Sequence, residues 1–130
     1  MYRAALLLAG LTLAASPAMA ETVERAVKAN ATSAIGGFFG YEVNTCYSSI
    51  IPDVKVKQAP ANGSFRIVPF EQTLGKDTSC AGKKVRGLAY VYTPKKGFTG
   101  SDEVVLDVPW SGNDHSLPTV YTNTYRIKVQ

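Results

Sequence analysis

The regular parts of this sequence alternate between apolar and polar residues with a period of two, and turn signals separate them. Leu88, Tyr90 and Tyr92, for example, fall on one side of an extended chain, which is typical of a half-buried strand. Segments of this kind, two of them weaker, are Thr22–Lys28, Tyr41–Cys46, Asp53–Lys57, Ser64–Phe70, Val85–Tyr92, Asp102–Trp110 and Thr119–Gln130. No window of a dozen residues carries an apolar stripe at helical spacing. The pattern predicts an all-β chain folded as an antiparallel β-sandwich of about seven strands.

One turn signal between two of these segments is specific. In Asp53–Lys57 the valines alternate with lysines, which is typical of a strand with one buried face. Asn62-Gly63 follows, and this dipeptide tolerates the positive φ angles of a tight hairpin turn. The chain then returns through Ser64–Phe70. We therefore predict a β-hairpin made of these two segments.

The N-terminal segment, Met1–Ala20, has the features of a secretory signal peptide. Arg3 precedes an apolar core at Ala4–Leu13, and Ala18-Met19-Ala20 is an A-x-A cleavage pattern. Residues 21–130, the remaining 110 of 130, then form one domain, which is too short for a multidomain enzyme. No later apolar run approaches the roughly 18–20 residues that cross a bilayer. We expect an exported protein, periplasmic or extracellular, that does not span the membrane.

The two cysteines, Cys46 and Cys80, predict one disulfide bond. An exported chain enters an oxidising compartment, and two cysteines allow a single pairing. In the chain-entropy model, closing a loop of this length stabilises the fold by roughly 3–4 kcal/mol. The alternative is a redox-active pair or a metal site. The spacing is not C-x-x-C, however, and the chain has one histidine.

The segment Tyr92–Val108 reads YTPKKGFTGSDEVVLDV and combines a strand end with a glycine-rich turn. Pro94 ends the strand ladder because it lacks an N–H donor. Gly97 and Gly100 let the chain turn sharply around Phe98, which we expect to close one end of the core.

This segment resembles the Y-T-P-x-x-G-F-x-G-x-D signature of bacterial immunoglobulin-like and cadherin-like repeats, which recur in exported and surface proteins. The residues that carry the resemblance are Tyr92, Pro94, Gly97, Phe98, Gly100 and Asp102. Tyr125–Val129 resembles the closing strand of these modules. The resemblance implies a single copy of an immunoglobulin/cadherin-like sandwich, whereas family members usually occur in tandem. Trp110 follows both cysteines, so the disulfide is not of the antibody type.

Calcium is the one cofactor that the resemblance brings into question, because some cadherin-like modules bind it near their domain ends. Asp102 and Glu103 are the weak candidate ligands. Adjacent residues face opposite sides of a strand, whereas calcium needs six to eight converging oxygens. The alternative is that Asp102 accepts backbone hydrogen bonds in the turn it follows.

The only histidine, His115, lies in a polar segment with Ser111, Asp114 and Ser116. A serine hydrolase needs a base that is held by a buried carboxylate beside an oxyanion hole. Neighbours in one short loop rarely provide that arrangement. The alternative, which we favour, is a polar loop between the last two strands, and we do not expect an enzyme.

A possible binding surface consists of basic and aromatic residues outside the core pattern. The basic residues flank the strand at 85–92 and are Lys83, Lys84, Arg86, Lys95 and Lys96, and the aromatic residues are Tyr41, Tyr47 and Trp110. A single basic patch attracts anionic envelope polymers, whereas scattered lysines keep an exported sandwich soluble. The formal net charge of +4 does not indicate a nucleic-acid-binding protein.

These observations predict an exported, non-catalytic binding or structural module of the bacterial envelope. Its loops or one sheet face would contact a partner, either a protein or an envelope polymer. The alternatives are a calcium-linked adhesion or assembly module and, less favoured, a small exported hydrolase that uses His115.

Overall fold

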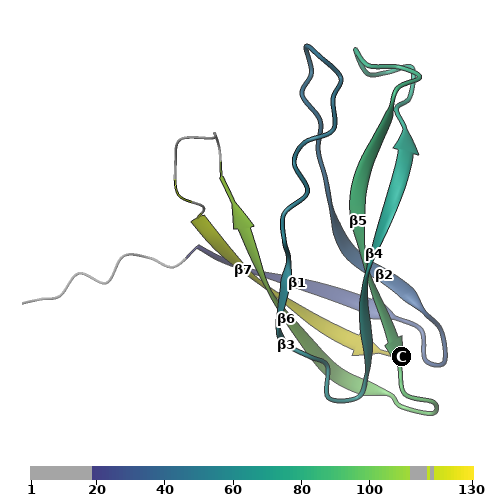
Figure 1. Ribbon diagram of the computed structural model, residues 1–130. Coiled ribbons are helices and arrows are strands. Elements are labelled where there is room, and N and C mark those ends of the chain that lie inside the picture. The colour runs from purple at the N-terminus through teal and green to yellow at the C-terminus, as the bar shows by residue number, and fades with distance from the viewer. Residues whose placement is uncertain (1–18, 112–116, 118) are drawn as a thin grey trace, which may run out of the picture.

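The computed structural model describes residues 19–111, 117 and 119–130, and every regular element within them is a β-strand (Figure 1). The strands are β1 (Ala20–Val27), β2 (Ser33–Phe39), β3 (Lys55–Gln58), β4 (Gly63–Thr73), β5 (Lys84–Pro94), β6 (Gly100–Trp110) and β7 (Thr119–Val129). In this part of the chain, no helix is long and apolar enough to cross a membrane. Most of the predicted signal peptide and the His115 loop lie outside the described residues.

The strands form two sheets, ordered β1-β7-β6-β3 and β2-β5-β4, which confirms the all-β prediction. One core lies between them. All pairs are antiparallel except β1 and β7, which run parallel with Ala20 opposite Thr122. The wholly antiparallel prediction is therefore wrong at this edge. The chain crosses to the other sheet directly after β1, so β1 pairs with the last strand rather than with its successor.

The alternating residues of β5, β6 and β7 supply most of this core, as their sequence predicts. Buried side chains from the three strands include Leu88, Tyr90, Tyr92, Val104, Leu106, Val108, Tyr125, Ile127 and Val129. Tyr90 meets Tyr125 edge to face across the two sheets, with ring centroids 5.9 Å apart.

The predicted strand at Tyr41–Cys46 is wrong, and β2 (Ser33–Phe39) takes its place in the sheet. Residues 41–46 form a turn, with one isolated bridge between Tyr41 and Ser48. The register of β2 shifts at Ile35, where a bulge interrupts the pairing with β5. A bulge breaks the period of two, so β2 has no clean alternation in its sequence.

The predicted hairpin around Asn62-Gly63 is also wrong. β3 pairs with β6 and β4 pairs with β5, so this connection passes from one sheet to the other. Glycine is needed at position 63 because the Tyr92 ring lies close to its backbone, and not because of its φ angle. A Cβ here would lie 2.6 Å from a Tyr92 ring carbon. β3 lies at a sheet edge and is exposed throughout, including Val56, which is 44% exposed.

The β5–β6 turn has the structure that its sequence predicts. β5 ends at Pro94, and Gly97 and Gly100 adopt φ angles of 78° and 128°. Phe98, between them, packs against the edge of the core.

Hydrogen bonds join three connections at this end of the sandwich, which we call the closed end. The N–H of Gly97 donates to Oδ1 of Asn30 in the β1–β2 turn at 2.8 Å. The N–H of Lys95 donates to the carbonyl of Asn62 in the β3–β4 connection at 2.9 Å. The three turns are thereby fixed to one another.

The opposite end carries the predicted disulfide, and we call it the disulfide end. Cys46 and Cys80 are bonded, with their Cα atoms 5.5 Å apart. The bond ties the loop 40–54 after β2 to the loop 74–83 between β4 and β5, and both project from the same end of the sandwich (Figure 1). A small second core of Leu74, Cys80 and Val85 lies beside it.

Candidate functional site

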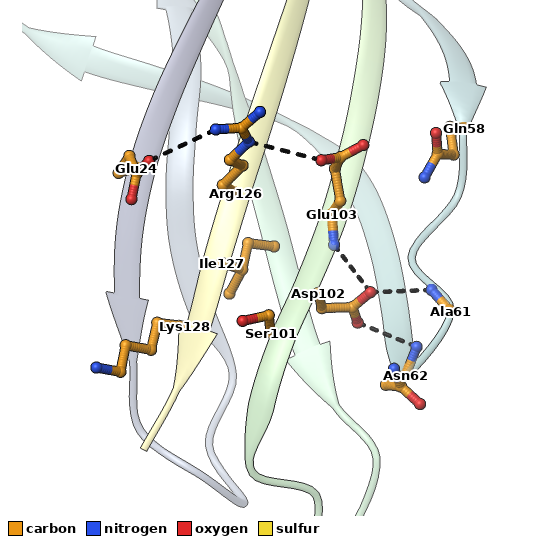
Figure 2. Close-up of a pocket in the computed structure, with 10 residues that line it drawn as sticks. All are labelled: Glu24, Gln58, Ala61, Asn62, Ser101, Asp102, Glu103, Arg126, Ile127 and Lys128. Atoms are coloured by element: carbon orange, nitrogen blue, oxygen red, sulfur yellow. Dashed lines mark hydrogen bonds and ion pairs between the residues drawn. The ribbon is translucent and has the colours of Figure 1, made fainter.

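The groove around Asp102 is the first candidate (Figure 2), with a volume of about 510 Å³. Asp102 is only 7% exposed, and each of its carboxylate oxygens accepts two hydrogen bonds. Oδ1 accepts from the N–H groups of Ala61 at 3.0 Å and Glu103 at 2.9 Å. Oδ2 accepts from the N–H of Asn62 at 3.0 Å and from the hydroxyl of Tyr92 at 2.7 Å. The carboxylate therefore anchors the β3–β4 connection to β6 and β5.

The prediction that Asp102 accepts backbone hydrogen bonds in the turn it follows needs correction. Two of its four donors, Ala61 and Asn62, lie about 40 residues earlier in the chain. Burial, reinforced by the hydrogen bond to this carboxylate, raises the pKa of Tyr92 far above its usual range. The bond thus keeps Tyr92 in its neutral, donating form.

Calcium binding stays a prediction at Asp102 and Glu103. The described residues contain no group of three or more histidine, cysteine, aspartate or glutamate side chains placed to hold a metal ion. Glu103 lies on the outer face of β6, where Arg126 binds it at 3.8 Å, while Asp102 points toward the core (Figure 2). The two carboxylates therefore do not converge.

The rest of the Asp102 groove is a charged sheet surface. Arg126 on β7 lies between Glu103 on β6, at 3.8 Å, and Glu24 on β1, at 4.0 Å (Figure 2). Glu24 and Arg126 are well exposed and Glu103 is half-buried, and at 3.8–4.0 Å each ion pair contributes little to stability. The residues lining this groove are engaged with one another, and nothing in their arrangement selects a ligand.

The disulfide end is the second candidate, and its first loop is rigidly built. The carboxylate of Glu42 accepts hydrogen bonds from the N–H groups of Asn44 and Thr45. These bonds, above all that from the Asn44 backbone, lower the pKa of Glu42. The backbone of Glu42 also pairs with that of Tyr47, and Cys46, one of the two disulfide-bonded cysteines, adopts a left-handed φ of 60°.

Three apolar side chains of this rigid loop project into solvent. Val43 is 60% exposed, Tyr47 76% and Ile50 77%. Exposed apolar side chains are ordinary when scattered, but these three belong to one loop that the disulfide fixes. We call this set the apolar tip.

An aromatic cluster adjoins the apolar tip on the outer face of the sheet β2-β5-β4. Phe39 and Phe70 pair with Gly87 from its two sides, and their rings stack at 6.1 Å. Gly87 leaves the room for this, because a Cβ there would lie 2.8 Å from the Phe70 ring. Tyr41 meets Phe39 edge to face at 6.2 Å. Tyr41 also packs against the small core of Leu74, Cys80 and Val85 beside the disulfide.

The predicted basic group is divided between the two ends of β5. Lys83, Lys84 and Arg86 lie at the disulfide end, whereas Lys95 and Lys96 follow the strand at the closed end. An eleven-residue strand spans roughly 35 Å, several times the distance over which salt screens charges. The five residues therefore form no single patch.

Trp110 ends β6 and is half-buried, so it is less free than its sequence position indicates. Its ring packs against Phe38 of β2 at 5.3 Å. Of the three predicted aromatic residues, only Tyr47 is mainly exposed. Sequence analysis missed Val43 and Ile50. The one signal for them is that each is an apolar residue within a turn-forming segment.

No protein-family model, curated protein or solved structure matches this chain. The immunoglobulin/cadherin-like identity therefore rests on the signature residues, and only the coarser all-β, two-sheet fold is established.

Proposed function

We propose that this chain is an exported, non-catalytic binding module of immunoglobulin-like or cadherin-like type that docks a protein partner at its disulfide end. The apolar tip is the observation that carries this proposal. Tyr47 and Ile50 are about three-quarters exposed, yet their loop is held by the disulfide and by the Glu42 hydrogen bonds. A partner thus meets a surface that is already ordered, and little conformational entropy is lost on binding.

The chemistry of the tip favours a protein over an envelope polymer. Tyrosine and isoleucine bury large apolar areas, and tyrosine is enriched among residues that dominate the energy of protein interfaces. Sugar polymers need many polar contacts, whereas the three exposed side chains of the tip offer one hydroxyl. The ring of Phe70 stacks on that of Phe39, which Tyr41 meets edge to face, so these rings partly cover one another.

Binding by strand addition is less well supported than binding by the tip. β4 is the long free edge of its sheet, but Pro69 lies in its middle and lacks an N–H donor. At the other edge of that sheet, β2 is bulged at Ile35. Both features discourage an added strand.

The test compares envelope proteins retained by the immobilised protein and by a Tyr47→Ser/Ile50→Ser variant. The retained protein is identified, purified and titrated, and we expect the variant to weaken its binding at least tenfold. Val56→Ser, which changes an exposed apolar residue of the other sheet, is the matched control and should bind as the wild type does. Equal binding by the tip variant would sink the proposal. If retention survives protease treatment of the extract, the partner is a polymer and not a protein.

A further inference from the structure

A separate pocket, with a volume of about 490 Å³, lies at the disulfide end of the sheet β2-β5-β4. Pro69 pairs with Leu88, and Glu71 pairs with Arg86, across β4 and β5. Paired residues of antiparallel strands project to the same face, and Leu88 belongs to the core. These four residues therefore share the inner face of the sheet at the end of the core, while Phe70 and Gly87, which also line the pocket, belong to the opposite face of the same strands.

The pocket combines apolar walls with one available cation. Pro69, Leu88 and Ile51, from the loop leading to β3, supply apolar surface. Arg86 is exposed, and its guanidinium forms no ion pair with any described residue, whereas Glu71 is bound by Lys84 at 3.8 Å. Glu71 lies opposite Arg86, and together with Lys84 the three side chains carry a net charge of +1.

The disulfide loop fixes the backbone of this arginine. The backbone N–H of Arg86 donates to the hydroxyl of Ser48 at 2.9 Å, two residues after Cys46. The guanidinium itself presents a planar fork of donors that matches a carboxylate or a phosphate. The volume also falls within the range of small-molecule sites, about 300–1,000 Å³.

We infer that this pocket binds an amphiphilic anion, an apolar chain or ring that carries a carboxylate or a phosphate. The apolar part lies against Ile51, Pro69 and Leu88, and the anionic head meets Arg86. This site is distinct from the apolar tip, so it stands or fails independently of the proposed protein docking.

Calorimetric titration of the purified protein tests the inference with decanoate and decyl phosphate, each below its micelle concentration. We expect one-to-one binding of both. Decyltrimethylammonium, with the same chain and the opposite charge, should bind at least tenfold more weakly, as should inorganic phosphate, which has the head alone. Arg86→Gln should weaken binding of the anions about tenfold, which corresponds to the loss of a charge-assisted contact. Lys96→Gln, at the far end of β5, is the control and should bind the anions as the wild type does.

Three results would overturn the inference. They are equal binding by Arg86→Gln, binding of the cationic amphiphile as tight as that of the anions, and no saturable binding of either anion. Vesicles with and without phosphatidylglycerol then show whether the anion is a membrane lipid or a molecule free in solution. Binding to the vesicles without binding of the monomeric amphiphiles would place recognition at a membrane surface and not in the pocket. The Tyr47→Ser/Ile50→Ser variant should titrate as the wild type does, so this proposal and the protein-docking proposal fail separately.

Discussion

The loops at the closed end and the loops at the disulfide end are held in place in different ways. At the closed end, three connections are joined by hydrogen bonds, and the Asp102 carboxylate uses both of its oxygens within the fold. At the disulfide end, a covalent bond fixes two loops that share only a small core. Because the disulfide replaces burial there, Tyr47 and Ile50 remain exposed. If they dock a partner, as we propose, stability and recognition are separated along the sandwich.

Removal of the disulfide is expected to have the largest effect on this division. The Cys46→Ser/Cys80→Ser variant should lose about 3–4 kcal/mol of unfolding free energy, because the denatured chain regains the freedom of the closed loop. Denaturant titration measures the loss, and reduction of the wild-type protein should reproduce it. A loss below about 1 kcal/mol would show that the native loop also gains freedom when the bond is removed, so that hydrogen bonds such as those of Glu42 do not hold it alone.

Substitution of Asp102 tests the closed end alone. Asp102→Ala should lower the unfolding free energy by about 3 kcal/mol, because it leaves Tyr92 and the Ala61 and Asn62 amides without their acceptor. Glu103→Ala, at the exposed neighbour, is the control and should cost less than about 1 kcal/mol. The anion titration of the pocket should be unchanged in both variants. A change there would mean that the two ends are coupled.

Alkaline pH is expected to have a smaller and graded effect. Burial raises the pKa of Tyr90 to about 12, and burial also raises that of Tyr125, whereas tyrosine in an unfolded chain ionises near pH 10. Above about pH 10 the unfolded state binds fewer protons than the folded state, so stability should fall as the pH rises toward 12 and be unaffected below 10. Thermal melts across this range measure the effect.

A matched pair of variants locates the alkaline effect. Tyr92→Phe should reduce the slope, since it removes another buried tyrosine with a raised pKa. Tyr47→Phe, at an exposed ring, should leave the slope as it is. Equal slopes in the two variants would contradict the assignment to buried tyrosines.

Sequence periodicity predicted β5, β6 and β7 because each keeps its alternation over a long run with one buried face. It failed at β2, where the bulge at Ile35 and the glycines remove the pattern. It also failed at Asn62-Gly63, because a dipeptide suited to a tight hairpin can equally join two sheets. Strand pairing is set by distant residues, which a local pattern does not contain.

The candidate site was predicted only in part for the same reason. The disulfide and Tyr47 follow from residue type, but the exposure of Val43 and Ile50 depends on where the loop is fixed. The division of the basic residues follows from the length of β5, a distance that composition does not reveal. The partners of Asp102 lie across the β3–β4 connection, which the sequence assigned to a hairpin.

The parallel pairing of β1 with β7 sets the order in which the fold can be completed. Ala20 and Thr122 are opposite one another although about 100 residues separate them. Contacts between such distant residues slow folding, because a long loop must close before they form. A chain that emerges from a ribosome or a translocation pore with its N-terminus first cannot finish this sheet until its last strand has followed. Such a chain therefore carries β1 without its partner strand for most of its passage.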